Sequence, residues 1–227
     1  QVQLFGEDEK HIKTVLRARE GEEITLCDGE GMDYQCRIAS LERGVLLDIL
    51  SKDVCETEPK TKITLYQGLP KADKMELIIQ KCVELGIDRI VAVSTERAIV
   101  KLDKKETKKL ERWQKIAEAA AKQSGRGKIP EIGQQVLKFK EAVAEAKELD
   151  GAIIPYEREQ ETGIRQFVQN FKGESVGVFI GPEGGFADEE IALAQENGIT
   201  PITLGKRILR TETAGMTTTA ILLYELD

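Results

Sequence analysis

From residue 62 onward, short apolar runs alternate with longer segments whose apolar residues recur at helical spacing. The runs 87–93 and 176–180 are mostly apolar, as strands buried on both faces are. Further strands are predicted over 62–67, 151–155 and 202–204. Helices are predicted over 75–85, 113–121, 162–171, 188–197 and 213–224. Alternation of this kind predicts an α/β domain with a mostly parallel sheet.

The first part of the chain has a different pattern. Runs 23–27 and 34–38 are joined by Asp28-Gly29-Glu30-Gly31, which is typical of a hairpin, and 44–50 is a third apolar run. A polar segment at 53–60 reads as a linker. The sequence therefore predicts two domains, a small β-barrel-like domain over residues 1–60 and the α/β domain over residues 61–227.

Composition limits the chemistry that is available. His11 is the only histidine, so histidine-based zinc sites and Ser-His or Cys-His nucleophile pairs are poor candidates, and we expect no metal. Cys27, Cys36, Cys55 and Cys82 form no C-x-x-C pair, which favours buried free thiols in a reducing cytoplasm. No apolar run reaches the roughly 18 residues of a membrane span, and no secretion leader is visible. Since the chain starts at Gln1 rather than Met, we expect residues before it.

The first candidate motif is 176–186, Val-Gly-Val-Phe-Ile-Gly-Pro-Glu-Gly-Gly-Phe, in which a buried strand runs into glycines. Ligands bind at the carboxyl ends of strands in open α/β sheets, and glycine lets the backbone approach them. A structural strand-to-helix turn with Asp188 as helix cap is the alternative. The motif is neither G-x-G-x-x-G nor a P-loop, which argues against dinucleotides and nucleoside triphosphates.

The second candidate motif is 204–214, Leu-Gly-Lys-Arg-Ile-Leu-Arg-Thr-Glu-Thr-Ala. A short strand ends at Gly205, a loop with two arginines follows, and a helix then begins. Thr211 or Thr213 can cap that helix, and Glu212 suits its positive end. Surface charge combined with a helix cap is the alternative interpretation.

Taken together, the two motifs resemble the bacterial 16S ribosomal RNA uridine N3-methyltransferase family of the SPOUT superfamily. The resemblance is nearly full length, and it includes 67–76, Gln-Gly-Leu-Pro-Lys-Ala-Asp-Lys-Met-Glu, and 118–126, Glu-Ala-Ala-Ala-Lys-Gln-Ser-Gly-Arg. It implies a SPOUT α/β domain with a C-terminal trefoil knot, which pattern reading alone would miss. It also implies a PUA-like β-barrel domain that holds RNA, and a cytoplasmic homodimer. The implied activity is S-adenosylmethionine-dependent methylation of rRNA, which is a step of ribosome biogenesis.

The resemblance also implies site residues. Arg210 would stabilise the negative charge that uracil gains when N3 loses its proton. Glu183 or Glu212 would accept that proton, or both would be structural, and the sequence leaves this open. Tyr156 would complete the wall of a cofactor pocket that comprises Pro155, Ile180, Gly181, Pro182, Gly184, Leu204, Gly205, Ile208, Leu209, Thr213 and Ala214.

RNA binding has to be local, because the net charge is −7. Basic residues do gather in one segment, at Lys101, Lys104, Lys105, Lys108, Lys109, Arg112 and Lys115. Uracil N3 lies on the Watson–Crick edge, so a paired uridine must be exposed before it reacts. The candidate phosphate contacts, each with plain surface charge as its alternative, are Arg17, Arg19, Arg37, Lys71, Lys74, Arg97, Arg112 and Arg126.

Three rival functions stay open: a non-catalytic RNA-binding or ribosome-assembly protein, a SPOUT enzyme with another target such as a tRNA ribose, and a nucleotide-using metabolic enzyme. The intact Gly and Arg-Thr-Glu-Thr stretches argue against the first. The length of the resemblance favours rRNA uridine over the second, and the missing phosphate-binding fingerprints argue against the third. Which uridine reacts, and whether it reacts in free rRNA or in an assembled subunit, is not encoded in these patterns.

Overall fold

The computed structural model describes residues 1–98 and 106–227, and the chain forms two compact units. We call them the N-terminal unit and the C-terminal unit, and each is described by itself. Most of the N-terminal unit comes from the start of the chain, but a short segment that follows the third helix also belongs to it. The N-terminal unit comprises Gln1–Glu58 with Gly125–Ile129, and the C-terminal unit comprises Pro59–Ser124 with Pro130–Asp227.

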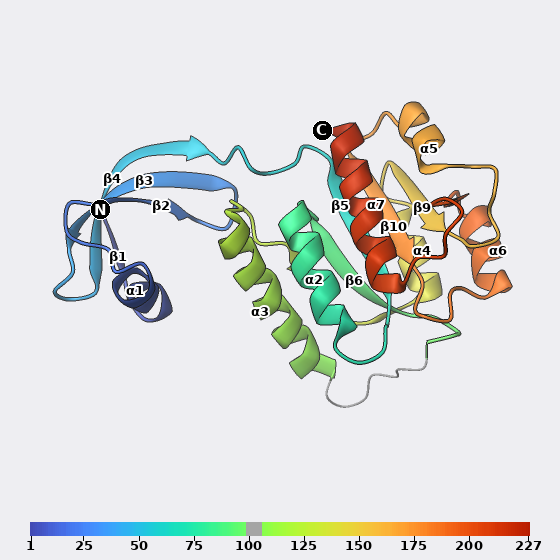
Figure 1. Ribbon diagram of the computed structural model, residues 1–227, viewed down its shortest axis with the longest axis horizontal. Coiled ribbons are helices and arrows are strands. Elements are labelled where there is room, and N and C mark those ends of the chain that lie inside the picture. Colours follow the sequence, from blue (N-terminus) through green and yellow to red (C-terminus); the bar gives the residue numbers. More distant parts are fainter. Residues whose placement is uncertain (99–105) are drawn as a thin grey trace. The chain divides into compact units, whose positions relative to one another are not determined.

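The N-terminal unit is an antiparallel sheet with a helical segment beside it (Figure 1). The strand order is β1-β4-β3-β2. The three strands expected from the sequence are confirmed, whereas the helical segment was not expected. The bounds are β1 Val2–Leu4, α1 Glu7–Lys10, the π-helical turn η1 His11–Val15, β2 Glu23–Cys27, β3 Met32–Ser40 and β4 Val45–Val54.

The core of this unit explains its helical segment. Ile12 of η1 is buried against alternate residues of β3 and β4, which share one face of the sheet: Cys36, Ile38, Val45 and Leu47. The segment Gly125–Ile129 joins the hairpin between β2 and β3, where the Gly31 amide donates to the Gly127 carbonyl at 2.8 Å.

The C-terminal unit is built on a parallel sheet, as the sequence predicts. The strand order is β11-β9-β10-β5-β6-β7, and β8 also pairs with β6. Every pairing among the described residues of this sheet is parallel. The bounds are β5 Lys62–Gly68, β6 Arg89–Ser94, β7 Glu131–Ile132, β8 Leu137–Lys138, β9 Gly151–Pro155, β10 Ser175–Ile180 and β11 Thr200–Ile202.

Helices cover both faces of this sheet. In Figure 1, α2 and α7 lie on one face with α3 against α2, while α4 and α6 lie behind the sheet. On the α4–α6 face, Tyr66 stacks on Phe179 with ring centroids 4.5 Å apart, and Phe139 of α4 meets Phe179 edge-on. The bounds are α2 Lys74–Leu85, α3 Glu106–Ser124, α4 Phe139–Ala146, α5 Ile164–Asn170, α6 Asp188–Glu196 and α7 Thr211–Leu226.

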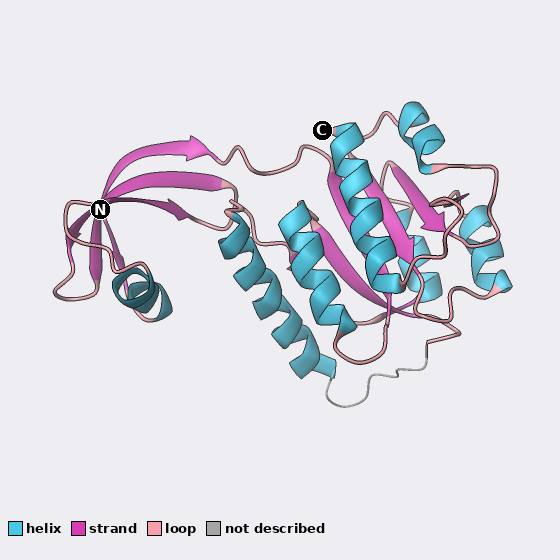
Figure 2. Cartoon of the chain, viewed as in Figure 1, coloured by secondary structure: helices cyan, strands magenta, loops and turns pink. Residues whose placement is uncertain are grey.

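This topology places the two sequence motifs near each other. The motif 176–186 comprises most of β10 and the loop after it, the motif 204–214 follows β11, and β9 lies between these strands. Parallel strands end at the same edge of a sheet, so all three connections meet there. Figure 2 shows loops, in pink, at the ends of β9 and β10 beside the beginning of α7.

The structure also describes the burial of the cysteines and the length of the helices. All four cysteines are free; Cys36, Cys55 and Cys82 are buried as expected, but Cys27 is exposed. None of the helices that the structure describes is both long and apolar enough to cross a membrane.

Candidate functional site

The ends of β9, β10 and β11 and the start of α7 enclose a pocket of about 1040 Å³. Every residue that the resemblance assigned to the cofactor lines it, with the exception of Thr213. Thr213 is exposed outside the pocket, whereas Thr211 lines it. Since a helix turns about 100° per residue, two positions on α7 that are two apart point in opposite directions. In this structure Thr211, and not Thr213, faces the pocket.

Thr211 ties three segments together at the floor of the pocket. Its hydroxyl donates to the Gly181 carbonyl at 2.6 Å and accepts from the Gln67 amide at 2.9 Å. Gln67 is fully buried, and the same nitrogen also donates to the Gly68 carbonyl. The N-cap of α7 is Arg210, without a side-chain hydrogen bond, so neither threonine caps the helix as expected. Thr211 instead fixes the β10 loop against β5 and α7.

Replacing this hydroxyl tests the anchor. We expect Thr211→Val to lower the free energy of unfolding by about 1–3 kcal/mol, because the buried Gln67 amide and the partly buried Gly181 carbonyl each lose a partner. Urea denaturation of the wild type and the variant measures the difference. Thr213→Val is the matched control, since Thr213 is exposed on the same turn. Equal destabilisation by the two variants would contradict the anchor.

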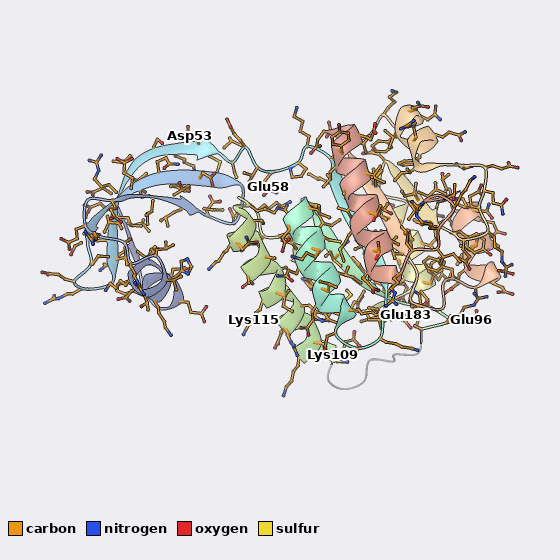
Figure 3. The ribbon with its side chains drawn as sticks, in the orientation of Figure 1. Asp53, Glu58, Glu96, Lys109, Lys115 and Glu183 are labelled. Atoms are coloured by element: carbon orange, nitrogen blue, oxygen red, sulfur yellow. The ribbon has the colours of Figure 1, made fainter. Side chains whose placement is uncertain are left out.

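A second cluster of contacts holds Glu183 in the same loop. Lys74 Nζ lies 2.8 Å from Glu183 Oε1 and 3.4 Å from Glu212 Oε2. The Lys71 amide donates to both Glu183 oxygens, at 3.1 and 3.3 Å. Figure 3 labels Glu183 near the first turn of α7. The structure thus brings two predicted catalytic carboxylates together around a lysine that the sequence assigned to RNA.

These contacts set the charge of Glu183. Partial burial raises the pKa of Glu183, but hydrogen bonds from Lys74, from its own backbone and from Lys71 outweigh burial, so the pKa lies below its ordinary value. The hydrogen bond to Glu183 raises the pKa of Lys74, and Glu212 adds to this effect. Glu183 and Lys74 are therefore both charged at neutral pH. Glu212 does not line the pocket itself.

Arg210 presents a cation to the pocket. It is exposed and lines the pocket, and its side chain has no hydrogen-bond or ion-pair partner among residues 1–98 and 106–227. Its backbone is extended, with φ −68° and ψ 154°, and its carbonyl accepts from the Ala214 amide at 2.8 Å. Because Thr211 is anchored beside it, the backbone of Arg210 has a fixed position at the pocket wall.

Two further groups shape the loop after β10. Arg97 donates from Nη1 to the Gly184 carbonyl at 3.2 Å, so an arginine that the sequence assigned to RNA contacts the loop. Glu190 accepts from the Ala187 and Glu96 amides, both at 2.9 Å. Asp188, the expected cap of α6, makes no side-chain cap hydrogen bond, because its carboxylate faces the β9 loop instead.

The remaining candidate RNA contacts divide into three groups. Arg126 has a side chain that is only 4% exposed and pairs with Glu58 at 2.6 Å, so its charge is already paired within the N-terminal unit. Arg37 and Arg112 are exposed but paired, with Glu23 and Glu76. Three exposed side chains have no ion-pair partner among the described residues: Arg17, Arg19 and Lys71.

The basic segment is only partly described. Lys101, Lys104 and Lys105 lie outside the described residues. Lys109 and Lys115, which Figure 3 labels, lie on α3. The described part of this segment is therefore one helix of the C-terminal unit.

Comparison with known proteins identifies the chain. A family model described as an RNA methyltransferase domain matches residues 57–223, and one described as an RNA methyltransferase PUA domain matches residues 6–50. Ribosomal RNA small subunit methyltransferase E of Bacillus subtilis is 35% identical, over 99% of this chain and 90% of the relative. The chain belongs to this methyltransferase family. The Mesomycoplasma hyopneumoniae member is 36% identical over 91% of this chain and 86% of its own length.

Solved structures of the methyltransferase family agree with the fold. The Neisseria gonorrhoeae small subunit methyltransferase E, bound to S-adenosylmethionine, has a TM-score of 0.86 and 35% identity. The match covers 97% of this chain and 90% of that one. The expected SPOUT-like α/β architecture and PUA-like N-terminal domain are confirmed.

The structure adds pocket residues that sequence reasoning missed. Thr211 was considered only as a cap, and Lys74 only as an RNA contact. Glu157, Glu159 and Gln160 follow β9 and also line the pocket. Their position after a strand next to the glycine loop is the one signal that could have identified them, because ligands gather at such strand ends.

Proposed function

We propose that this protein transfers the methyl group of S-adenosylmethionine to N3 of a uridine in 16S rRNA of the small ribosomal subunit. The observation that carries the proposal is the pocket at the ends of β9, β10 and β11, with the cationic side chain of Arg210 at its wall. Relatives named as small subunit rRNA methyltransferases, one of them bound to the cofactor, support it.

The pocket suits a cofactor of this kind. Its volume of about 1040 Å³ is at the upper end of ordinary ligand pockets, which leaves room for a substrate base beside the cofactor. Gly205, with φ +106°, would place a Cβ in open space, so its backbone is accessible to a ligand. Leu204 and Leu209, in the loop after β11, supply apolar walls against which adenine can pack.

The protein's own groups position the reactants and stabilise the charge that develops. The cofactor supplies an activated methyl group, so the protein mainly positions the reactants and stabilises charge. The N3 proton of uracil passes to solvent, and Arg210 stabilises the negative charge that the uracil oxygens then gain. Thr211 and the Lys74–Glu183 pair hold the loops that position the reactants.

The contacts of Glu183 favour a positioning role for this residue. A carboxylate whose pKa is lowered by a lysine and by backbone amides is a weaker base than an ordinary one. Glu212 lies behind Lys74 and does not line the pocket. Of the two alternatives that the sequence leaves open, we therefore favour structural roles for both carboxylates.

We further propose how the rest of the molecule serves this reaction. The PUA-like domain over residues 1–60 holds rRNA through Arg17 and Arg19, which are exposed. The methyltransferase domain over residues 61–227 carries a trefoil knot between the two motifs. The protein acts in the cytoplasm as a homodimer, with the cofactor pocket beside the partner subunit.

Methyl transfer to ribosomal subunits tests the proposal. Small subunits from cells that lack this protein are incubated with it and with labelled S-adenosylmethionine, and the rRNA is digested to nucleosides. We expect label in N3-methyluridine and in no other nucleoside. Label in another nucleoside, or in tRNA alone, would contradict the proposed target, and cofactor binding without transfer to any rRNA would favour a non-catalytic RNA-binding role.

A further inference from the structure

Glu157 places a carboxylate at the pocket that no contact within the protein explains. It lies two residues beyond β9 and lines the pocket. Its two oxygens would lie 3.4 and 3.5 Å from a Cβ added to Gly185, so they lie against the backbone of the loop after β10. Among the residues that the structure describes, this carboxylate has no hydrogen-bond or ion-pair partner.

The residues on either side of Glu157 point elsewhere. The Tyr156 hydroxyl donates to Asp188 Oδ1 at 2.9 Å, and Arg158 Nη1 donates to Asp188 Oδ2 at 3.0 Å. Both neighbours thus anchor the β9 loop to the start of α6, and the cation adjacent to Glu157 in sequence is already paired. Glu157 lies between these two anchored residues and faces the pocket instead.

The sheet order indicates which part of a ligand reaches Glu157. β9 lies between β11 and β10, so its end is flanked by the loop 203–209 on one side and by the glycine loop on the other. A ligand that spans both loops has its middle over the end of β9. In S-adenosylmethionine the ribose occupies the middle, between adenine and the sulfonium.

A carboxylate is well suited to a ribose. It has two oxygens that only accept hydrogen bonds, and the ribose presents two adjacent hydroxyls that donate them. In other nucleotide-binding α/β folds, an acidic residue beyond a strand next to the glycine loop binds the ribose in this way. Glu157 has the same placement, after the strand that neighbours β10.

We propose that Glu157 binds the cofactor ribose by accepting hydrogen bonds from its 2′- and 3′-hydroxyls. This assignment rests on the proposed function, because it takes the pocket to be the cofactor site. Glu157 is then a cofactor-specificity residue, which selects ribonucleosides over deoxyribonucleosides. Its substitution is expected to lower the affinity for the cofactor.

Three ligands test the assignment by calorimetry with the full chain. S-adenosylhomocysteine carries ribose and the amino acid, 5′-methylthioadenosine carries ribose alone, and 5′-methylthio-2′,3′-dideoxyadenosine carries neither. We expect Glu157→Gln to weaken binding of the first two about tenfold and by equal factors, as loss of a charged acceptor does. The dideoxy ligand is expected to bind the wild type and E157Q equally. Glu161→Gln is the matched control, because Glu161 is exposed and outside the pocket lining.

Each other outcome overturns a specific part of the proposal. Weaker binding of S-adenosylhomocysteine alone would mean that Glu157 binds the ammonium group and not the ribose. Unchanged binding of all three ligands would overturn the Glu157 assignment and leave the proposed function intact. A wild-type protein that binds neither S-adenosylhomocysteine nor S-adenosylmethionine would overturn the proposed cofactor site together with the assignment.

Discussion

Arg210→Ala is expected to lower kcat for rRNA methylation by about 10²- to 10³-fold, which is the usual effect of removing one preorganised group that stabilises a developing anion. The guanidinium lines the pocket without a partner among the described residues, so its charge is available to the substrate. We expect the Kd of S-adenosylhomocysteine to change little, since the apolar parts of the pocket wall are formed by other residues and the charge of Arg210 acts on the substrate base. Single-turnover methylation at saturating rRNA and calorimetry measure the two quantities.

Two control variants separate charge from structure in this experiment. Arg210→Lys keeps the positive charge but loses the planar fork of donors, so it should recover only part of the rate. Arg165→Ala removes an exposed arginine on α5, outside the pocket, and should keep the wild-type rate. A near-normal rate for Arg210→Ala would contradict the proposed role, as would a rate loss that is explained entirely by lost cofactor binding.

The sheet of the C-terminal unit could be predicted because periodicity reports burial. The strands 176–180 and 151–155 are buried on both faces and read as apolar runs, and the helices over 75–85 and 113–121 bury one stripe each. β7 and β8 could not be predicted, since two residues carry no period. The helical turn at His11–Val15 was missed because only Ile12 is buried there.

The glycine loops of the pocket could be predicted from the sequence, but the roles of its side chains could be predicted less well. Glycines after a strand indicate a ligand loop from local sequence alone, and Gly181, Gly184 and Gly205 do line the pocket. The role of Lys74 depends on Glu183, which is distant in sequence, so charge alone suggested a phosphate contact. The ion pair of Arg126 could not be predicted for the same reason, because its partner Glu58 comes from another segment of the chain.

Lys74→Met tests whether Lys74 acts within the pocket, as the structure indicates, or contacts an RNA phosphate, as its charge suggested. We expect it to weaken S-adenosylhomocysteine binding roughly tenfold or more, the usual effect of losing a charge-assisted hydrogen bond. The variant leaves Glu183 and Glu212 near each other without the shared cation, which raises the pKa of Glu183 and frees the loop that begins at Gly181. Calorimetry measures the cofactor affinity, and a salt titration measures RNA binding.

The two roles predict different salt dependence. If Lys74 acts within the pocket, the slope of log K against log salt for rRNA binding stays at its wild-type value. If Lys74 contacts a phosphate, the slope falls by roughly 0.7–0.9 and cofactor affinity is unchanged. Lys71→Met is the matched control for the pocket role, because Lys71 reaches Glu183 only through its backbone amide, which the substitution keeps. Normal cofactor affinity in Lys74→Met would therefore contradict the pocket role of Lys74 and favour a contact with RNA. Glu183 would then be held by the Lys71 amide and its own loop.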